Sequence, residues 1–180
     1  MLLDELKIIK KCARNNPKAQ KTLYDNYKQK WFMICLRYAH NKTEAEDMLQ
    51  EGLISVFRSI KQFNPEQAKF SAWSNKIMVN AALQYLRKWK KFDFTQNIDD
   101  YQNHMVYNED AYDNLGTKEL TLLIQKLPDG YRVVFNMYVI EGYKHKEIAE
   151  ILEISENTSK SQLLKAKKML RNQLETVLKY

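Results

Sequence analysis

The sequence predicts an all-α protein made of two small helical domains joined by an acidic flexible linker, the C-terminal domain being a helix-turn-helix. Only 4 Gly and 3 Pro occur in 180 residues, which is few for a protein with many tight turns. Apolar residues recur at three- and four-residue spacing along most of the chain. The chain carries +7 overall, yet residues 92–115 hold six carboxylates and no Lys or Arg, which leaves the remainder at +13. We therefore expect domains at 1–91 and 117–180, with a linker at 92–116.

Apolar spacing and polar stops predict the first two helices. The first is expected from Leu2 to about Arg14, because Asn15-Asn16-Pro17 follows it. The second is expected from about Lys18 to Ala39. Its apolar stripe consists of Leu23, Tyr27, Trp31, Ile34 and Tyr38.

The next two helices complete the N-terminal domain. The third is expected to start with Thr43 as its N-cap and Glu46 as the capping-box partner, and to end at Asn64-Pro65. Its predicted core stripe is Ala45, Leu49, Leu53, Val56 and Ile60. The fourth is expected from about Phe70 to Lys90. Its predicted core stripe is Phe70, Trp73, Ile77, Ala81 and Tyr85.

Four helices are also expected after the linker. The predicted ranges are Thr117–Lys126, ended by Pro128-Asp129-Gly130, then Tyr131–Glu141, ended by Gly142, then Lys144–Leu152, and a last helix that Ser155 caps and that runs to about Leu178. The last two are joined only by residues 153–155, with Ala149 small enough for a close crossing. Ile148, Leu152 and Ile154 are expected to fill the core beneath. This is the helix-turn-helix layout.

The N-terminal half of the second helix in such a motif enters the major groove of duplex DNA. Hydroxyls, amides and cations suit base edges and phosphates. The side chains predicted to contact duplex DNA are Asn157, Thr158, Lys160, Ser161, Gln162, Lys165 and Lys168. A solvated basic face, or a helical hairpin that binds protein, is the alternative.

The fourth helix has a polar stripe of cations and amides, backed by aromatic residues. The residues of this stripe and its flanks are Lys76, Asn80, Gln84, Arg87, Lys88 and Lys91. Such a mixture can follow the backbone of single-stranded nucleic acid while amides or rings hold unstacked bases. The alternatives are core packing for Trp73 and a solvated helix end for the lysines.

The third helix groups Glu46, Asp47, Gln50 and Glu51 near its start. We considered acid–base or metal chemistry for these carboxylates. The helix dipole favours acidic residues in a first turn, and no Ser/His/Asp set or Gly-rich phosphate loop accompanies them. A solvated face and a protein-docking face both stay open.

Nothing else in the sequence indicates catalysis, a metal or a cofactor. Cys12 and Cys35 form no paired motif and are expected to be reduced thiols, and the three His show no ligand spacing. The N-terminus has no apolar signal region, and no apolar run approaches the ~20 residues of a membrane helix. We expect a cytoplasmic protein without stable membrane insertion.

Three groups of motifs together resemble the extracytoplasmic-function (ECF) class of bacterial sigma factors over nearly the whole chain. The first is Ala45-Glu46-Asp47-Met48-Leu49-Gln50-Glu51 with Val56-Phe57. The second is Phe70-Ser71-Ala72-Trp73 with Val79-Asn80 and Tyr85-Leu86-Arg87. The third comprises Leu127-Pro128, Val133-Val134-Phe135, Glu141-Gly142-Tyr143, Glu147-Ile148-Ala149-Glu150-Ile151-Leu152 and Thr158-Ser159-Lys160-Ser161.

The resemblance implies a dissociable specificity subunit that binds core RNA polymerase and recognises and melts promoter DNA. By analogy, the polymerase-binding residues are Asp47, Gln50, Glu51 and Phe57. Asn80 and the loop 63–69 would take a flipped minus-ten base, while Arg87, Lys88 and Lys91 hold nearby backbone. The C-terminal helix would read the duplex minus-thirty-five element. The family also implies an anti-sigma partner.

Three residues depart from the family pattern. Glu153 stands where such turns often have Gly, so we expect a slightly different turn. Ser159 replaces a common Val, and Gln162 a common Arg. The alternative function is a conventional helix-turn-helix regulator that binds an operator and uses its N-terminal helices to sense or dimerise.

Overall fold

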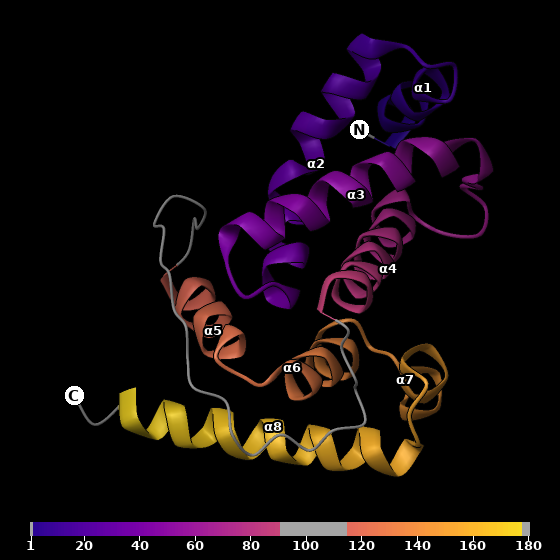
Figure 1. The fold of residues 1–180 in the computed structure, drawn as a ribbon. Helices are drawn as coiled ribbons and strands as arrows, with labels where there is room; N and C mark the ends of the chain where they lie inside the picture. Colours follow the sequence, from indigo (N-terminus) through magenta and orange to yellow (C-terminus); the bar gives the residue numbers. More distant parts are fainter. Residues whose placement is uncertain (1, 91–114, 178–180) are drawn as a thin grey trace. The chain divides into compact units, whose positions relative to one another are not determined.

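The structure is a computed structural model that describes residues 2–90 and 115–177 (Figure 1). The chain divides into two compact units with the boundary between Lys88 and Trp89, and each unit is described by itself. Most of the predicted linker, residues 92–114, lies outside the described residues, as does Lys91. Leu115 and Gly116, which we had assigned to the linker, begin a helix.

The first unit contains the four predicted helices and a short 3₁₀ turn. The elements are α1 (Leu2–Cys12), α2 (Pro17–Tyr38), α3 (Lys42–Ser59), η1 (Ile60–Gln62) and α4 (Phe70–Lys90). Helix α2 packs against both α1 and α3. The bounds of α4 are those predicted, and α3 ends a few residues before the predicted stop because the chain tightens into η1 first.

Asparagine side chains cap the N-termini of α2 and α3. The Asn16 Oδ1 atom accepts from the Ala19 amide at 3.0 Å, and Pro17 occupies the first helical position, where no amide donor is needed. The Asn41 Oδ1 atom accepts from the amide of Glu44 at 2.9 Å. The predicted cap at Thr43 is therefore wrong, because Asn41 takes this role two residues earlier.

The core of the first unit surrounds Trp31, which is fully buried and donates from Nε1 to the Ser74 Oγ atom at 3.2 Å. On α3 the buried face is Ala45, Met48, Gly52 and Val56. The predicted stripe is thus confirmed at Ala45, Val56 and Ile60 and wrong in its middle. Leu49 and Leu53 are only partly buried. Apolar residues occupy neighbouring positions on this helix, and spacing alone does not decide which of them faces inward.

Gly52 explains which face of α3 turns inward. A Cβ atom at this position would collide with the Met78 side chain of α4, which is fully buried. The missing side chain therefore lets α4 approach α3 closely. Val79, Ala82 and Leu86 continue the buried side of α4, whereas Trp73 and Ile77 of the predicted stripe are partly buried.

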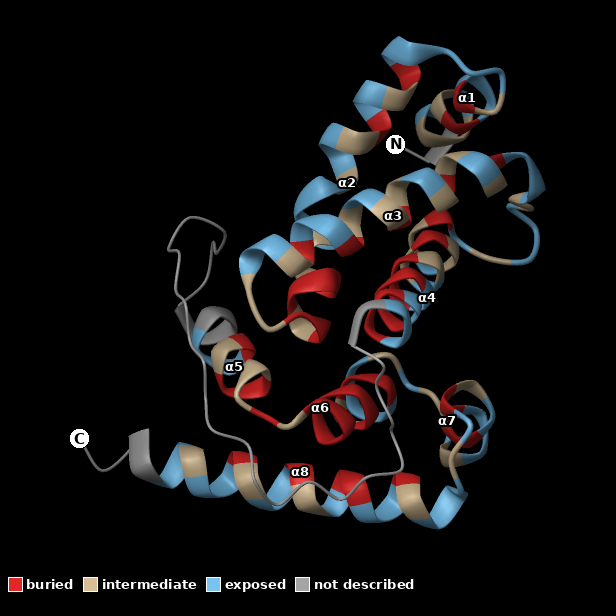
Figure 2. Cartoon of the chain, viewed as in Figure 1, coloured by how far each residue is buried: buried red, intermediate tan, exposed pale blue. Residues whose placement is uncertain are grey.

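The second unit is a set of short helices on one long helix. The elements are α5 (Leu115–Gln125), α6 (Asp129–Phe135), the π-helical turn η2 (Asn136–Ile140), α7 (His145–Leu152) and α8 (Glu156–Val177). Helices α5, α6 and α7 each pack against α8. Figure 2 shows the buried positions of α8 gathered on one side. Part of the core consists of Leu123, Ile124, Leu127, Tyr131, Ala166 and Leu170.

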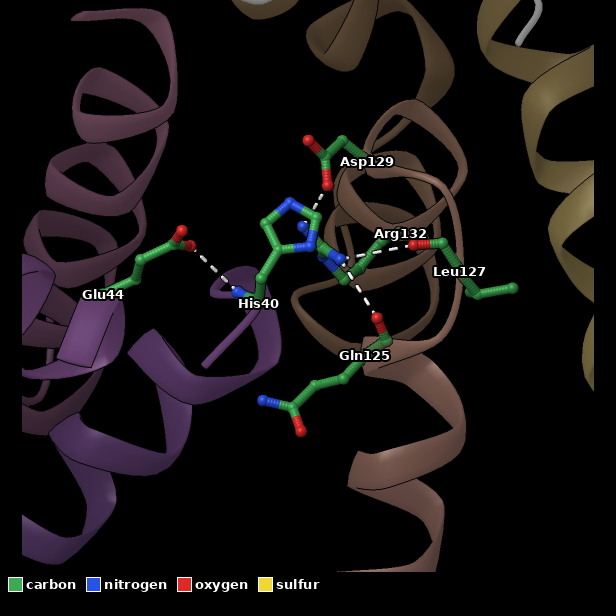
Figure 3. Close-up of polar contacts among 6 residues, drawn as sticks. All are labelled: His40, Glu44, Gln125, Leu127, Asp129 and Arg132. Carbon is green, nitrogen blue, oxygen red and sulfur yellow. Dashed lines mark hydrogen bonds and ion pairs between the residues drawn. The ribbon is translucent and has the colours of Figure 1, made fainter. Parts of the chain in front are cut away.

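The predicted helix stop before Pro128 is confirmed, because α5 ends at Gln125. The predicted start of the next helix at Tyr131 is wrong, since Asp129 and Gly130 already form the first turn of α6. The physical reason is the fully buried Arg132 (Figure 3). Its Nη1 atom donates to the carbonyl oxygens of Gln125 at 3.1 Å and Leu127 at 3.2 Å, and Nη2 pairs with the Asp129 carboxylate. The guanidinium thus satisfies carbonyls at the end of α5 and lets the next helix start at once.

The turn between α7 and α8 confirms the predicted Ser155 cap, whose Oγ atom accepts from the Thr158 amide at 2.9 Å. The expectation of an altered turn at Glu153 is wrong. Glu153 has φ 57° and ψ 41°, the left-handed conformation that glycine usually supplies after a helix. The Ile154 amide then donates to the Ala149 carbonyl at 3.0 Å and closes the turn.

Replacing Glu153 with Gly is expected to make the protein more stable than replacing it with Ala, by about 1 kcal/mol, because only glycine adopts the left-handed region without a Cβ clash. Both variants lack the carboxylate, so their difference isolates the backbone conformation. Urea denaturation of the full chain measures it. Equal stabilities of the two variants would show that Glu153 is not strained.

Candidate nucleic-acid and protein-docking surfaces

Helix α4 presents the predicted polar stripe to solvent. Its exposed members are Lys76, Asn80, Gln84, Arg87 and Lys88, and Lys91 lies outside the described residues. The i+4 spacing places them opposite the buried side of the helix. The sequence therefore located this face correctly, and its contact with DNA stays a prediction.

The loop before α4 is held by hydrogen bonds and by an aromatic anchor. The Asn64 Oδ1 atom accepts from the Glu66 amide at 3.0 Å, and the Asn64 carbonyl accepts from the Gln67 amide at 3.2 Å. The Phe63 ring lies against Phe70 and Trp73, with centroids 5.3 and 5.4 Å away. The loop thus leaves the core at Phe63 and exposes its polar residues beside the start of α4.

The acidic face of α3 is also placed as predicted. Asp47 and Gln50 are exposed, whereas Glu51 and Phe57 are partly buried. Sequence reasoning missed Ile54, whose side chain is 54% exposed. Ile54 follows Gln50 by four residues and Glu51 by three, so the same spacing could have found it.

A hydrogen bond joins this face to α4. The Tyr85 hydroxyl donates to the Asp47 Oδ2 atom at 3.1 Å. Burial raises the pKa of Tyr85 to about 12, and the bond to Asp47 and the charges of Asp47, Glu44 and Glu51 act in the same direction. The phenol therefore remains a donor at neutral pH.

Helix α8 exposes only part of the set predicted to meet duplex DNA. Asn157, Lys160, Ser161 and Lys168 are exposed, while Thr158 and Lys165 are partly buried. Gln162 is fully buried, so its predicted contact with DNA is corrected. The Gln162 amide instead lies against Gly130, where an added Cβ would be 3.1 Å from Nε2. A polar residue type was mistaken for a surface position.

Several α8 side chains already make local contacts. The Thr158 Oγ1 atom lies 2.9 Å from the Ser155 hydroxyl oxygen, and Ser161 donates to the Thr158 carbonyl at 2.9 Å. The Lys160 ammonium lies 3.6 Å from the Glu156 carboxylate, which is an exposed and weak pair. The missed residue on this face is Leu164, which is 71% exposed and follows Ser161 by three positions.

A small polar cluster fixes α7 on α8. The His145 Nδ1 atom lies 2.9 Å from the Oγ atom of the buried Ser159. The His145 ring stacks on the Tyr138 ring, with centroids 4.4 Å apart. Burial lowers the pKa of His145, Lys160 and Lys167 lower it further, and Glu156 opposes them. Neutral imidazole is thus the favoured form in the folded protein.

Comparison with known proteins shows the family to which the chain belongs. Residues 23–92 match the model for sigma-70 region 2, and residues 117–170 match the model for sigma-70, region 4. The ECF RNA polymerase sigma factor SigW of Bacillus subtilis (strain 168) is 34% identical, over 93% of this chain and 95% of its own. The chain belongs to the ECF RNA polymerase sigma factors.

Other relatives of this ECF sigma factor agree. RNA polymerase sigma factor SigV of Bacillus subtilis is 30% identical over 85% of this chain and 89% of its own, and the ECF RNA polymerase sigma-E factor of Haemophilus influenzae is 26% identical over 98% of both. The solved complex of the sigma factor RpoE with the anti-sigma factor NepR from Bartonella quintana shares the fold, with a TM-score of 0.56, 17% identity and coverage of 86% of this chain and 96% of that one.

Membership assigns the function of the whole chain. The ECF sigma factor directs RNA polymerase in promoter recognition and transcription initiation, and it belongs to a non-enzymatic family. The helix-turn-helix is therefore part of a sigma factor, and the alternative of a conventional regulator is wrong. In the described part of the chain, no helix is long and apolar enough to cross a membrane, and no three His, Cys, Asp or Glu residues group as metal ligands.

The C-terminal unit of the sigma factor is expected to lose stability as the pH falls from 7.5 to 5.5. The pKa of His145 is lower in the folded protein than in the unfolded chain, so the unfolded chain binds the proton more readily. The loss of stability therefore begins as the pH falls to about 6.5, the usual pKa of histidine. Thermal unfolding across this range measures it. His145→Gln should flatten the profile, and an unchanged slope in this variant would contradict the assignment.

Proposed function

We propose that the sigma factor uses three separate helix faces for three partners. Helix α3 would dock on core polymerase, α4 would hold the unwound minus-ten strand, and the exposed side of α8 would read the duplex minus-thirty-five element. One observation carries the proposal: a chain that matches regions 2 and 4 exposes an acidic face, a face of cations and amides, and a helix-turn-helix.

The α3 face suits a basic protein surface. Asp47 and Gln50 offer acceptors, and Ile54 adds an exposed apolar side chain between them and Phe57. Interfaces gain most of their affinity from a few residues buried near their centre, from which the surrounding contacts exclude water. We infer that Ile54 is such an anchor, with Asp47 and Glu51 pairing with polymerase cations.

The α4 face suits a strand whose bases are unstacked. Lys76, Arg87 and Lys88 are exposed cations that would meet phosphates, as would Lys91, which lies outside the described residues. The amides of Asn80 and Gln84 can both donate and accept toward a base edge. Flipping a base costs a few kcal/mol, which contacts in a pocket have to offset. The loop of residues 63–69, beside Asn80's helix, would supply the other side of that pocket.

The α8 face suits a major groove. Asn157, Lys160 and Ser161 point polar groups to solvent, and Leu164 offers an apolar side chain of the kind that contacts thymine methyl groups. Lys168 would reach a phosphate, with Thr158 and Lys165 contributing from partly buried positions. Gln162 and Ser159 would act indirectly, from the buried side of α8, by holding this helix against the neighbouring helices.

We also propose a cytoplasmic location and regulation by an anti-sigma factor. The support is the solved relative RpoE, which is bound to NepR. The absence of a membrane-crossing helix in residues 2–90 and 115–177 agrees with a protein that meets polymerase in the cytosol.

The test of the proposal adds the full chain to core polymerase on a library of promoter fragments. Transcripts that start at defined sites and disappear when the chain is omitted are the expected result. Initiation at these sites that survives alanine replacement of the exposed residues on one of the three faces would overturn the assignment of that face.

Replacing Asn80 with Ala is expected to slow promoter opening by roughly 5- to 150-fold, because a base that leaves the stack would lose its amide partner at a cost of about 1–3 kcal/mol. Permanganate reactivity of unpaired thymines measures opening. Binding to core polymerase and to the upstream duplex should be retained. Gln29→Ala, an exposed amide of α2, is the matched control. Normal opening by Asn80→Ala would remove Asn80 from the strand-binding set.

A further inference from the structure

Tyr85 links the two functional faces of the first unit. Its side chain is 9% exposed and rises from the buried side of α4, between the proposed strand contacts Gln84 and Arg87. Its hydroxyl crosses to α3 and donates to the Asp47 Oδ2 atom at 3.1 Å. A single side chain of the strand-binding helix therefore touches the carboxylate that we assign to polymerase docking.

The Tyr85 hydroxyl can orient the Asp47 carboxylate without neutralising its negative charge. A Lys or Arg in the place of Tyr85 would pair with Asp47 and neutralise it. The phenol is neutral, so it fixes one carboxylate oxygen while the acidic character of the face is kept. The nearby charges of Glu44 and Glu51 reinforce the protonated phenol, which cannot add to the negative charge at neutral pH.

Packing makes the phenol a rigid donor. The Tyr85 ring is held in the core, and Gly52 lets α4 lie close to α3 one turn beyond Asp47. A carboxylate that is held in one rotamer before binding loses less conformational entropy when a partner cation arrives. Asp47 is exposed, so its carboxylate can receive such a cation while Tyr85 holds Oδ2.

We propose that Tyr85 is a positioning residue for polymerase docking, which fixes the Asp47 carboxylate in the orientation that a cationic group of core polymerase meets. The proposal rests on the docking role given to α3 above. It also ties the orientation of α4 to that of the docked α3 face, since the same hydroxyl connects the two helices.

The experiment measures the dissociation constant of full-length chain and core polymerase for Tyr85→Phe, Asp47→Ala and the double variant. Tyr85→Phe keeps the ring and removes only the donor, and it is expected to weaken binding roughly two- to tenfold. Asp47→Ala should weaken binding at least as much. The double variant should bind no more weakly than Asp47→Ala alone, because Tyr85 acts through Asp47.

Tyr27→Phe provides the matched control. The Tyr27 hydroxyl donates to the Glu5 carboxylate and joins α2 to α1. Its loss removes the same kind of bond and should leave core binding unchanged. Urea denaturation and binding to duplex upstream DNA, measured for every variant, separate a loss of folding from a loss of docking.

The outcomes distinguish the inference from the proposed function. Unchanged core binding by Asp47→Ala would overturn the docking role of this residue and the inference with it. Weakened binding by Asp47→Ala but not by Tyr85→Phe would overturn the inference alone. A further loss on adding Tyr85→Phe to Asp47→Ala would overturn it as well, because Tyr85 would then act through packing rather than through Asp47.

Discussion

The polar backbone groups at the helix ends govern how this chain is laid out. A helix leaves amides without partners at its start and carbonyls at its end, and buried ends need other donors and acceptors. This glycine-poor chain meets that need with side chains. Asn16, Asn41 and Ser155 accept from first-turn amides, and the buried Arg132 donates to carbonyls at the end of α5. Each such bond sets where a helix begins or ends, and hence which residues it exposes.

In the first unit, fixed helix ends place opposite chemistries on neighbouring helices. The inner sides of α3 and α4 meet at Gly52 and Met78, which leaves the acidic side of α3 and the cationic side of α4 in solvent. Close packing transmits the position of one helix to the other, because a well-packed interior has little room to adjust. The Tyr85–Asp47 bond adds a polar connection to that packing. The acidic face of α3 and the cationic face of α4 therefore share one rigid support.

In the second unit, α8 has to serve as a core helix and as a recognition helix. Its inner side is held by apolar residues and also by polar ones, with Ser159 beside His145 and Gln162 against Gly130. The outer side is left with short polar groups, lysines and Leu164. The left-handed Glu153 and the Ser155 cap fix the angle at which α8 leaves α7. The position of the exposed α8 side chains therefore depends on the polar contacts that Ser159 and Gln162 make on the buried side of the helix.

The amino-acid sequence was enough to predict the all-helical class, the helix-turn-helix, the exposed α4 stripe and the family resemblance, because these depend on spacing and on motif order. It did not determine the cap at Asn41, the start of α6 at Asp129, the exposure of Ile54 and Leu164, or the burial of Gln162. Neighbouring residues of like character leave the inward side of a helix undecided until another helix packs on it. Helix packing makes that choice, since burial and a hydrogen-bond partner from a distant segment are properties of the folded chain rather than of a residue type.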